Sequence, residues 1–140
     1  MNTPAQQEII EEFALFDDWM DKYDHLIGLG KTLPLIEPKY KTDQYIIKGC
    51  QSKVWLRAEQ QEGRVNFWAD SDAIITKGIV SVLIRAFSGL PAHEIANAPT
   101  DFIKEIGLSD HLSPTRANGL VSMIKQMKLY AAAFAAQNNA

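Results

Sequence analysis

Two short runs of alternating apolar and polar residues flank the dipeptide Glu62-Gly63, and this pattern restricts the possible folds more than any other feature. The first run, residues 54–60, has apolar side chains at Val54, Leu56 and Ala58, and the second has them at Val65, Phe67 and Ala69. Alternation of this kind is typical of a half-buried strand, and Glu-Gly suits a tight turn. The sequence therefore predicts an antiparallel hairpin with one face on a core.

The register of this hairpin is restricted to two choices. The apolar faces match only if Val54 pairs with Ala69 or with Ser71. In either register Asp72 lies opposite Gln51 or Lys53. We therefore expect the segment 70–72 to lie beside the segment that contains Cys50.

Helical patterns precede the hairpin. Thr3-Pro4 predicts a helix start, and Ile9, Ile10, Phe13, Phe16 and Met20 follow at helical spacing. A second short helix is expected over residues 21–30. An extended loop follows over residues 31–40, because it contains two prolines. A short strand is expected over residues 44–48.

Helical patterns also follow the hairpin. Residues 73–88 predict a helix that ends at Gly89, and short helical turns are expected over 91–98 and 101–107. The last helix begins at Ser113-Pro114, and its apolar face comprises Leu120, Met123, Ile124, Met127, Ala131 and Phe134. This order predicts an α+β fold, in which a small antiparallel sheet packs against several helices in one domain spanning residues 1–140.

Composition excludes several classes of function. The chain has 140 residues and a formal net charge of −3, so no basic excess is available for nucleic acid. Its apolar stretches are too short to span a bilayer, and its first residues lack the layout of a signal peptide. A single cysteine cannot form an internal disulfide. We expect a cytoplasmic protein that binds neither nucleic acid nor membrane.

That single cysteine, Cys50, lies between two expected strands and is the candidate reactive group. Gly49 permits a sharp turn of the backbone before it. Gln51 and Ser52 follow it and can donate hydrogen bonds to a sulfur anion. The alternative is that Cys50 is a small buried apolar residue, which is the usual state of a free cysteine.

Asp72 and Arg116 are the charged candidates near this loop. Asp72 is expected to cap the following helix, and as a neighbour of Cys50 it would raise the pKa of the thiol unless a cation compensates. Arg116 is predicted on the inward face of the last helix, at its first turn. It either forms an ion pair, for example with Asp72, or orients the cysteine loop and stabilises negative charge on sulfur.

Four blocks of the sequence resemble the SufE family. The run Ile47-Lys48-Gly49-Cys50-Gln51-Ser52-Lys53-Val54-Trp55 is similar to the family pattern V-x-G-C-Q-S-x-V-W, although proline is frequent at the position of Lys48. Further similarity lies in residues 23–35, in 69–73 with Lys77-Gly78, and in 111–120. These blocks occur in the family's order and cover nearly the whole chain.

The resemblance implies a fold similar to the IscU-type scaffold and a role as a sulfur acceptor. Such proteins take sulfur from a cysteine desulfurase (SufS- or CsdA-like), stimulate that enzyme and relay the sulfur to a downstream scaffold for iron–sulfur cluster assembly. The chain would then be an accessory protein with no cofactor of its own, since pyridoxal phosphate belongs to the desulfurase. Cys50 would carry the persulfide. Gly49, Gln51, Ser52, Asp72 and Arg116 match the family motifs without an assigned chemical role.

Other classes of function would each require further residues. A hydrolase would need a histidine within reach of Cys50, a thiol peroxidase would need a resolving cysteine, and a metal site or cluster scaffold would need several ligands. The sequence does not separate the SufE branch from the CsdE branch, or a monomer from a homodimer. For the acceptor we expect the Cys50 loop to fold inward at rest and to swing out when the partner binds.

Overall fold

The computed structural model describes residues 2–138 and contains a three-stranded antiparallel sheet in the order β1-β2-β3. The strands are β1 (Val54–Gln61), β2 (Arg64–Ser71) and β3 (Leu90–Pro91). Val54 pairs with Ser71, which is one of the two registers expected. Glu62 and Gly63 both have positive φ angles, as a two-residue hairpin turn requires. The predicted hairpin is confirmed, whereas the two-residue strand β3 was not predicted.

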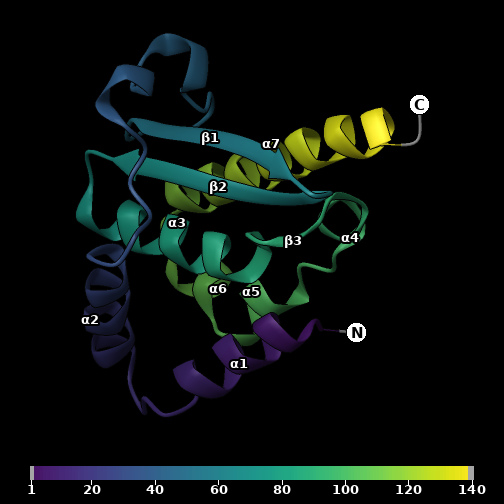
Figure 1. Cartoon of the computed structure of the whole chain (residues 1–140). Coiled ribbons are helices and arrows are strands. Elements are labelled where there is room, and N and C mark those ends of the chain that lie inside the picture. The colour runs from purple at the N-terminus through teal and green to yellow at the C-terminus, as the bar shows by residue number, and fades with distance from the viewer. Residues whose placement is uncertain (1, 139–140) are drawn as a thin grey trace.

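The helices surround one side of this sheet (Figure 1). They are α1 (Pro4–Phe13), α2 (Trp19–Gly30), α3 (Ile74–Phe87), α4 (Ala92–Asn97), α5 (Asp101–Glu105), α6 (Leu108–His111) and α7 (Pro114–Asn138). The segment before β1, drawn above β1 in Figure 1, contains two short 3-10 helices, η1 (Pro38–Tyr40) and η2 (Asp43–Tyr45). The expected α+β fold class is therefore confirmed, with α6 as an additional short helix. No helix within residues 2–138 has both the length and the apolar character needed to cross a membrane.

The core lies between the sheet and the two long helices. Val54, Leu56, Val65 and Phe67 of the hairpin are buried and belong to one apolar cluster. The helices contribute Ile79, Val82, Leu83 and Ala86 from α3, and Leu120, Met123, Met127 and Ala131 from α7. The alternation in the hairpin and the helical spacing of these residues together direct one face of each element into this core.

The first helix begins where the sequence predicts but ends earlier. Thr3 caps α1 through its hydroxyl, which accepts a hydrogen bond from the Gln6 amide, and the Gln6 side chain completes the capping box. The helix ends at Phe13, and α2 begins at Trp19 after the cap residue Asp18. Met20 is 71% exposed, so the expectation that it continues the apolar face of the first helix is wrong.

The strand expected over residues 44–48 is also wrong. Residues Asp43–Tyr45 form the 3-10 helix η2. The two residues that follow η2 pair with the start of β1 but form no strand. Ile46 and Trp55 form an isolated antiparallel bridge, and the Ile47 amide donates to the Val54 carbonyl at 2.8 Å. The chain leaves β1 immediately afterwards, and this departure creates the loop that contains Cys50.

Helices α2 and α3 cross at very short range. A Cβ atom built on Gly78 would lie 2.2 Å from the Leu26 carbonyl oxygen, and one on Gly30 would lie 3.1 Å from the Gly78 nitrogen. Only residues without a side chain allow the two backbones this approach. The crossing fixes the start of α3, which lines the site described below.

Candidate functional site

The loop formed by residues 48–53 lies against helix α7. Gly49 has a φ angle of 92°, a conformation that residues with a side chain rarely adopt. A Cβ atom at this position would lie 2.6 Å from the Ser122 hydroxyl oxygen of α7. Glycine therefore serves both the turn and the close contact with the helix.

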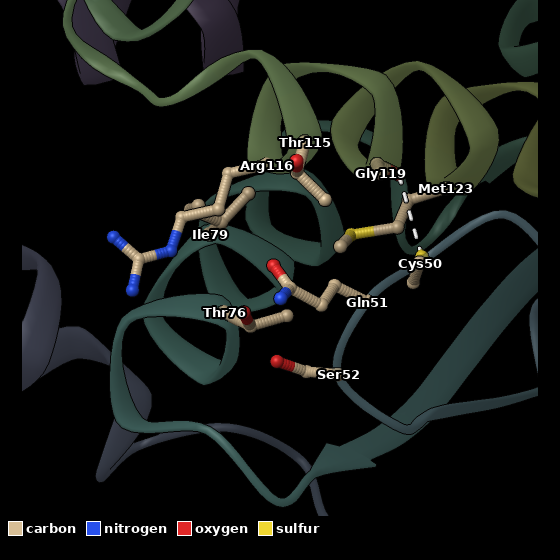
Figure 2. Close-up of a pocket in the computed structure, with 9 residues that line it drawn as sticks. All are labelled: Cys50, Gln51, Ser52, Thr76, Ile79, Thr115, Arg116, Gly119 and Met123. Atoms are coloured by element: carbon tan, nitrogen blue, oxygen red, sulfur yellow. Dashed lines mark hydrogen bonds between the residues drawn. The ribbon is translucent and has the colours of Figure 1, made fainter.

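Cys50 is half-buried and its side chain faces α7. Its Sγ lies 3.6 Å from the Gly119 carbonyl oxygen, to which the thiol donates a weak hydrogen bond (Figure 2). A Cβ atom on Gly119 would lie 3.5 Å from Sγ, so the missing side chain leaves open space beside the sulfur. Burial raises the pKa of the Cys50 thiol above its ordinary value. The thiol is thus protonated at neutral pH in this inward position.

A pocket of about 300 Å³ lies next to the thiol, between the loop, α3 and α7. The residues that line it are Cys50, Gln51, Ser52, Thr76, Ile79, Thr115, Arg116, Gly119 and Met123. In Figure 2 the Gln51 and Ser52 side chains project from the loop into the space between the two helices. The structure therefore brings four of the six candidate residues, Cys50, Gln51, Ser52 and Arg116, to one pocket.

Asp72 anchors the loop rather than the following helix. Its Oδ1 accepts a hydrogen bond from the Lys53 amide at 3.0 Å, and its own amide donates to the Lys53 carbonyl at 3.3 Å. The expected capping role is wrong, because the N-cap of α3 is Ala73, which makes no side-chain capping bond. The pKa of Cys50 is raised by burial, and Asp72 is not among the causes.

Arg116 lies at the first turn of α7 and is exposed, so the prediction of an inward-facing side chain is wrong. Among residues 2–138 it forms no ion pair with Asp72 or any other carboxylate. Its guanidinium extends along the pocket away from Cys50 in Figure 2. Periodicity placed it on the face of Leu120, but the start of α7 projects beyond the core, which leaves the guanidinium in solvent.

Asp70, one residue before the end of β2, holds neighbouring segments together. Its carboxylate contacts Lys41 Nζ at 3.0 Å and Lys77 Nζ at 3.3 Å, and it accepts a hydrogen bond from the Ser71 amide. Partial burial acts to raise the pKa of Asp70, but the hydrogen bonds from Lys41, Ser71 and Lys77 outweigh it, and the pKa is lowered. These contacts tie the segment before the cysteine loop to β2 and α3.

Several residues of the site were not predicted. Gly119 and Ser122, which contact Cys50 and Gly49, are three residues apart and share one face of α7. A glycine inside a helix is a signal for close packing, and Gly119 could have been recognised on this basis. The pocket residues Thr76 and Met123 carry no comparable signal, since both fit an ordinary helix.

The histidines and acidic residues form no second reactive cluster with Cys50. None of the three histidines lines the Cys50 pocket. His25 contacts Glu12 and the ring of Phe13, and His111 stacks on Trp19. Within residues 2–138, no three residues of the types His, Cys, Asp and Glu gather closely enough to hold a metal ion. The site therefore offers a thiol, amides, hydroxyls and one arginine.

Comparison with known protein families shows which family this chain belongs to. The family model for the Fe-S metabolism associated domain, SufE, matches residues 7–131. The chain belongs to the SufE family. The SufE match includes the whole cysteine loop, the hairpin and most of α7.

Individual SufE relatives agree with this assignment. An uncharacterized SufE-like protein of Rhizobium meliloti is 40% identical over 126 residues, which cover 86% of this chain and 90% of that protein. A SufE-like protein of Synechocystis is 36% identical, with 94% of this chain and 82% of the relative covered. The chloroplastic/mitochondrial SufE-like protein 1 of Arabidopsis thaliana is 40% identical, but the match covers 89% of this chain and only 34% of that longer protein.

A solved structure confirms the fold independently of close sequence similarity. The solution structure of a hypothetical protein from Thermus thermophilus matches with a TM-score of 0.81 and 17% sequence identity. The match covers 97% of this chain and 99% of that one. Membership of the SufE family associates the chain with iron–sulfur metabolism.

Proposed function

We propose that this protein accepts sulfur from a cysteine desulfurase onto Cys50, stimulates that enzyme and relays the sulfur for iron–sulfur cluster assembly. The observation that carries the proposal is the position of Cys50. It is the single cysteine of the chain, and it lies on a glycine-turned loop, half-buried beside a pocket of about 300 Å³. Family membership supplies the chemical context, iron–sulfur metabolism.

The proposed transfer is a thiol–persulfide exchange. The Cys50 thiol loses its proton to solvent, and the thiolate attacks the outer sulfur of a persulfide on the desulfurase. A new S–S bond forms on Cys50, the donor S–S bond breaks, and the donor cysteine leaves as a thiolate. The outer sulfur keeps its oxidation state throughout, so the exchange needs no oxidant or reductant.

The inward position of Cys50 suits storage better than attack. Burial raises the pKa of the thiol, and only the thiolate is nucleophilic. Movement of the loop into solvent would remove this effect and expose the sulfur to the donor. We therefore propose that docking of the desulfurase draws the loop outward and that the loaded loop returns to the pocket.

The pocket chemistry supports a sulfur anion. The hydroxyl of Thr115 and the amide of Gln51 line it and can donate hydrogen bonds, and Arg116 contributes a positive charge at its far side. The first turn of α7, which bears Thr115 and Arg116, adds the positive end of a helix dipole. These groups would offset part of the cost of holding a negatively charged sulfur in the pocket.

The lone cysteine also protects the cargo. A second thiol in the same chain could attack the Cys50 persulfide, form a disulfide and release the sulfur as sulfide. This chain contains no second cysteine, so that intramolecular loss is impossible. Release then depends on an external acceptor, which is the behaviour required of a relay. We expect this chemistry in a reducing compartment such as the cytoplasm.

Mass measurement tests the proposal directly. The protein is incubated with a pyridoxal-phosphate cysteine desulfurase and free cysteine, and intact masses are compared before and after reduction. The expected result is a reducible gain of one sulfur atom on wild type and none on Cys50→Ser. An equal gain on both proteins, or no gain on wild type, would contradict the assignment to Cys50. Desulfurase turnover measured in the same mixture tests the stimulation.

A further inference from the structure

The outer side of helix α7 carries a second surface feature. Together with α4 it forms an open groove with a volume of about 590 Å³. The apolar residues that line it are Ala96 of α4 and Val121, Ile124, Leu129 and Ala132 of α7. We refer to this feature, with Lys125 and Lys128, as the α4–α7 groove.

The apolar residues of the α4–α7 groove are unusually exposed. Val121 is 64% exposed and Leu129 is 54% exposed, and both are among the few large apolar side chains of residues 2–138 that reach solvent to this extent. Single exposed apolar residues are common, but two that share one groove indicate an interaction surface. The groove runs from Val121 to Ala132, which corresponds to about 16 Å along the helix axis.

Two lysines give the groove a positive charge. Lys128 donates a hydrogen bond to the Ala98 carbonyl after the end of α4, so its amine is held at the groove. Lys125 is exposed, and neither lysine forms an ion pair with a carboxylate of residues 2–138. Within residues 2–138, no acidic residue lines the groove. Its charge is therefore available to a partner.

The groove lies on the opposite side of α7 from Cys50. Gly119 contacts Cys50, and Val121, two residues later, is rotated from it by roughly 200° about the helix axis. Lys128 and Ala132 lie on the same face of α7 as Val121. A molecule in the groove would thus leave the Cys50 pocket open.

We propose that the α4–α7 groove binds an acidic amphipathic helix of a partner protein. The apolar face of such a helix would cover Val121, Ile124 and Leu129, and its carboxylates would meet Lys125 and Lys128. The length of the groove suits about three turns of helix rather than a small molecule. A second copy of this chain fits poorly, because symmetric packing would bring the lysines of the two copies toward each other.

The position of the groove should allow two partners to bind this protein at the same time. Because the groove and the Cys50 pocket occupy opposite sides of α7, the partner in the groove and a protein that exchanges sulfur with Cys50 can bind together. The proposal does not depend on the sulfur chemistry of Cys50. Loss of either function by mutation should leave the other intact.

Peptide binding to the full chain, isotope-labelled for NMR, tests the proposal. The probe is a synthetic helical peptide of about 15 residues with leucines along one face and glutamates beside them, and its twin carries lysine in place of each glutamate. The glutamate peptide is expected to shift the amide signals of Ala96, Val121, Leu129 and Ala132 and to leave those of Gln51 and Ser52 unchanged. The lysine peptide is expected to bind at least about fivefold more weakly, the effect of roughly 1 kcal/mol.

Substitutions identify the responsible residues. Lys125→Glu and Leu129→Ser should each weaken the glutamate peptide about fivefold or more, whereas Lys31→Glu, the same charge change on an exposed lysine outside the groove, should have no effect. Equal binding of both peptides, shifts outside the groove, or equal weakening by Lys31→Glu would overturn the proposal. Self-association of wild type that Leu129→Ser abolishes would assign the groove to a second copy instead. Sulfur loading of Cys50 should be unchanged in the groove variants.

Discussion

The Asp72 carboxylate accepts a hydrogen bond from the Lys53 amide at 3.0 Å, while the Asp72 amide donates to the Lys53 carbonyl at 3.3 Å. This reciprocal pair closes the end of the cysteine loop against β2. Lys53 lies three residues after Cys50, and the hydrogen bond of the thiol goes to the Gly119 carbonyl instead. The position of Asp72 suits a restraint on the freedom of the loop.

Removal of the Asp72 carboxylate should loosen the loop. Because Asp72 is exposed, Asp72→Ala should lower the free energy that holds the loop closed by about 0.5–1 kcal/mol. The open population of the loop should then rise roughly two- to fivefold. The rate of Cys50 alkylation by iodoacetamide, measured at fixed pH, should rise by the same factor. Asp72→Asn retains a side-chain oxygen acceptor and is the matched control, with a smaller rise expected. Equal rates in wild type and Asp72→Ala would show that this pair does not restrain the loop.

Gly49 should tolerate no side chain. In Gly49→Ala the positive φ angle costs about 1–2 kcal/mol, and the new methyl group collides with the Ser122 hydroxyl oxygen. The free energy of unfolding in urea should fall accordingly, or the loop should detach from α7. The double variant Gly49→Ala/Ser122→Ala removes the collision but leaves the backbone strain, so it should recover part of the loss. No coupling between the two sites in this cycle would argue against the close contact.

The thiol should give stability a distinctive pH dependence. Burial raises the pKa of Cys50 in the folded state, so between the unfolded and folded values the folded protein binds more protons than the unfolded one. The contribution of the thiol to stability is complete below the unfolded pKa, about 8.5, and is lost as pH rises through the folded value. Urea unfolding across this range should show a decline in wild type relative to Cys50→Ser. A parallel pH dependence of the two proteins would contradict burial of the thiol.

Gly78, at the crossing of α2 and α3, should be the glycine whose replacement by alanine destabilises the fold most. Gly78→Ala would force its Cβ against the Leu26 carbonyl, and separation of the two backbones should cost about 1–3 kcal/mol or more. Gly28→Ala is the matched control in the same pair of helices, because no atom lies within 4 Å of its Cβ position. That control should gain about 0.5–1 kcal/mol from helix propensity. Thermal unfolding of both variants distinguishes these opposite signs.

Local patterns predicted the hairpin and its register well, because alternation and turn position together leave few alternatives. The same patterns did not predict the contacts of two charged residues, Asp72 and Arg116. Asp72 has the sequence position of a helix cap, but the observed register brings the Lys53 amide within its reach. Arg116 shares the helical face of Leu120, yet α7 extends past the core at that point. Periodicity gives the direction of a side chain but not where the core ends.

The site itself was predictable around Cys50 and not on the facing helix. Gly49, Gln51 and Ser52 adjoin the cysteine in sequence, so their proximity follows from chain connectivity. Gly119 and Ser122 lie about 70 residues away and meet the loop only through the packing of α7 on the sheet. No local rule specifies that packing. The same limit explains why the α4–α7 groove was not anticipated.

Gly119 has a consequence for attempts to engineer this protein. A glycine inside a long helix costs about 1 kcal/mol of stability relative to alanine, so a search for stabilising changes would select this position early. An alanine would fit at ordinary contact distance beside the thiol, and the folded protein would accept it. Its methyl group, however, would occupy the free volume next to Sγ. If Cys50 carries sulfur as proposed, a more thermostable variant obtained in this way should load less sulfur, and a melting curve alone would not reveal the defect.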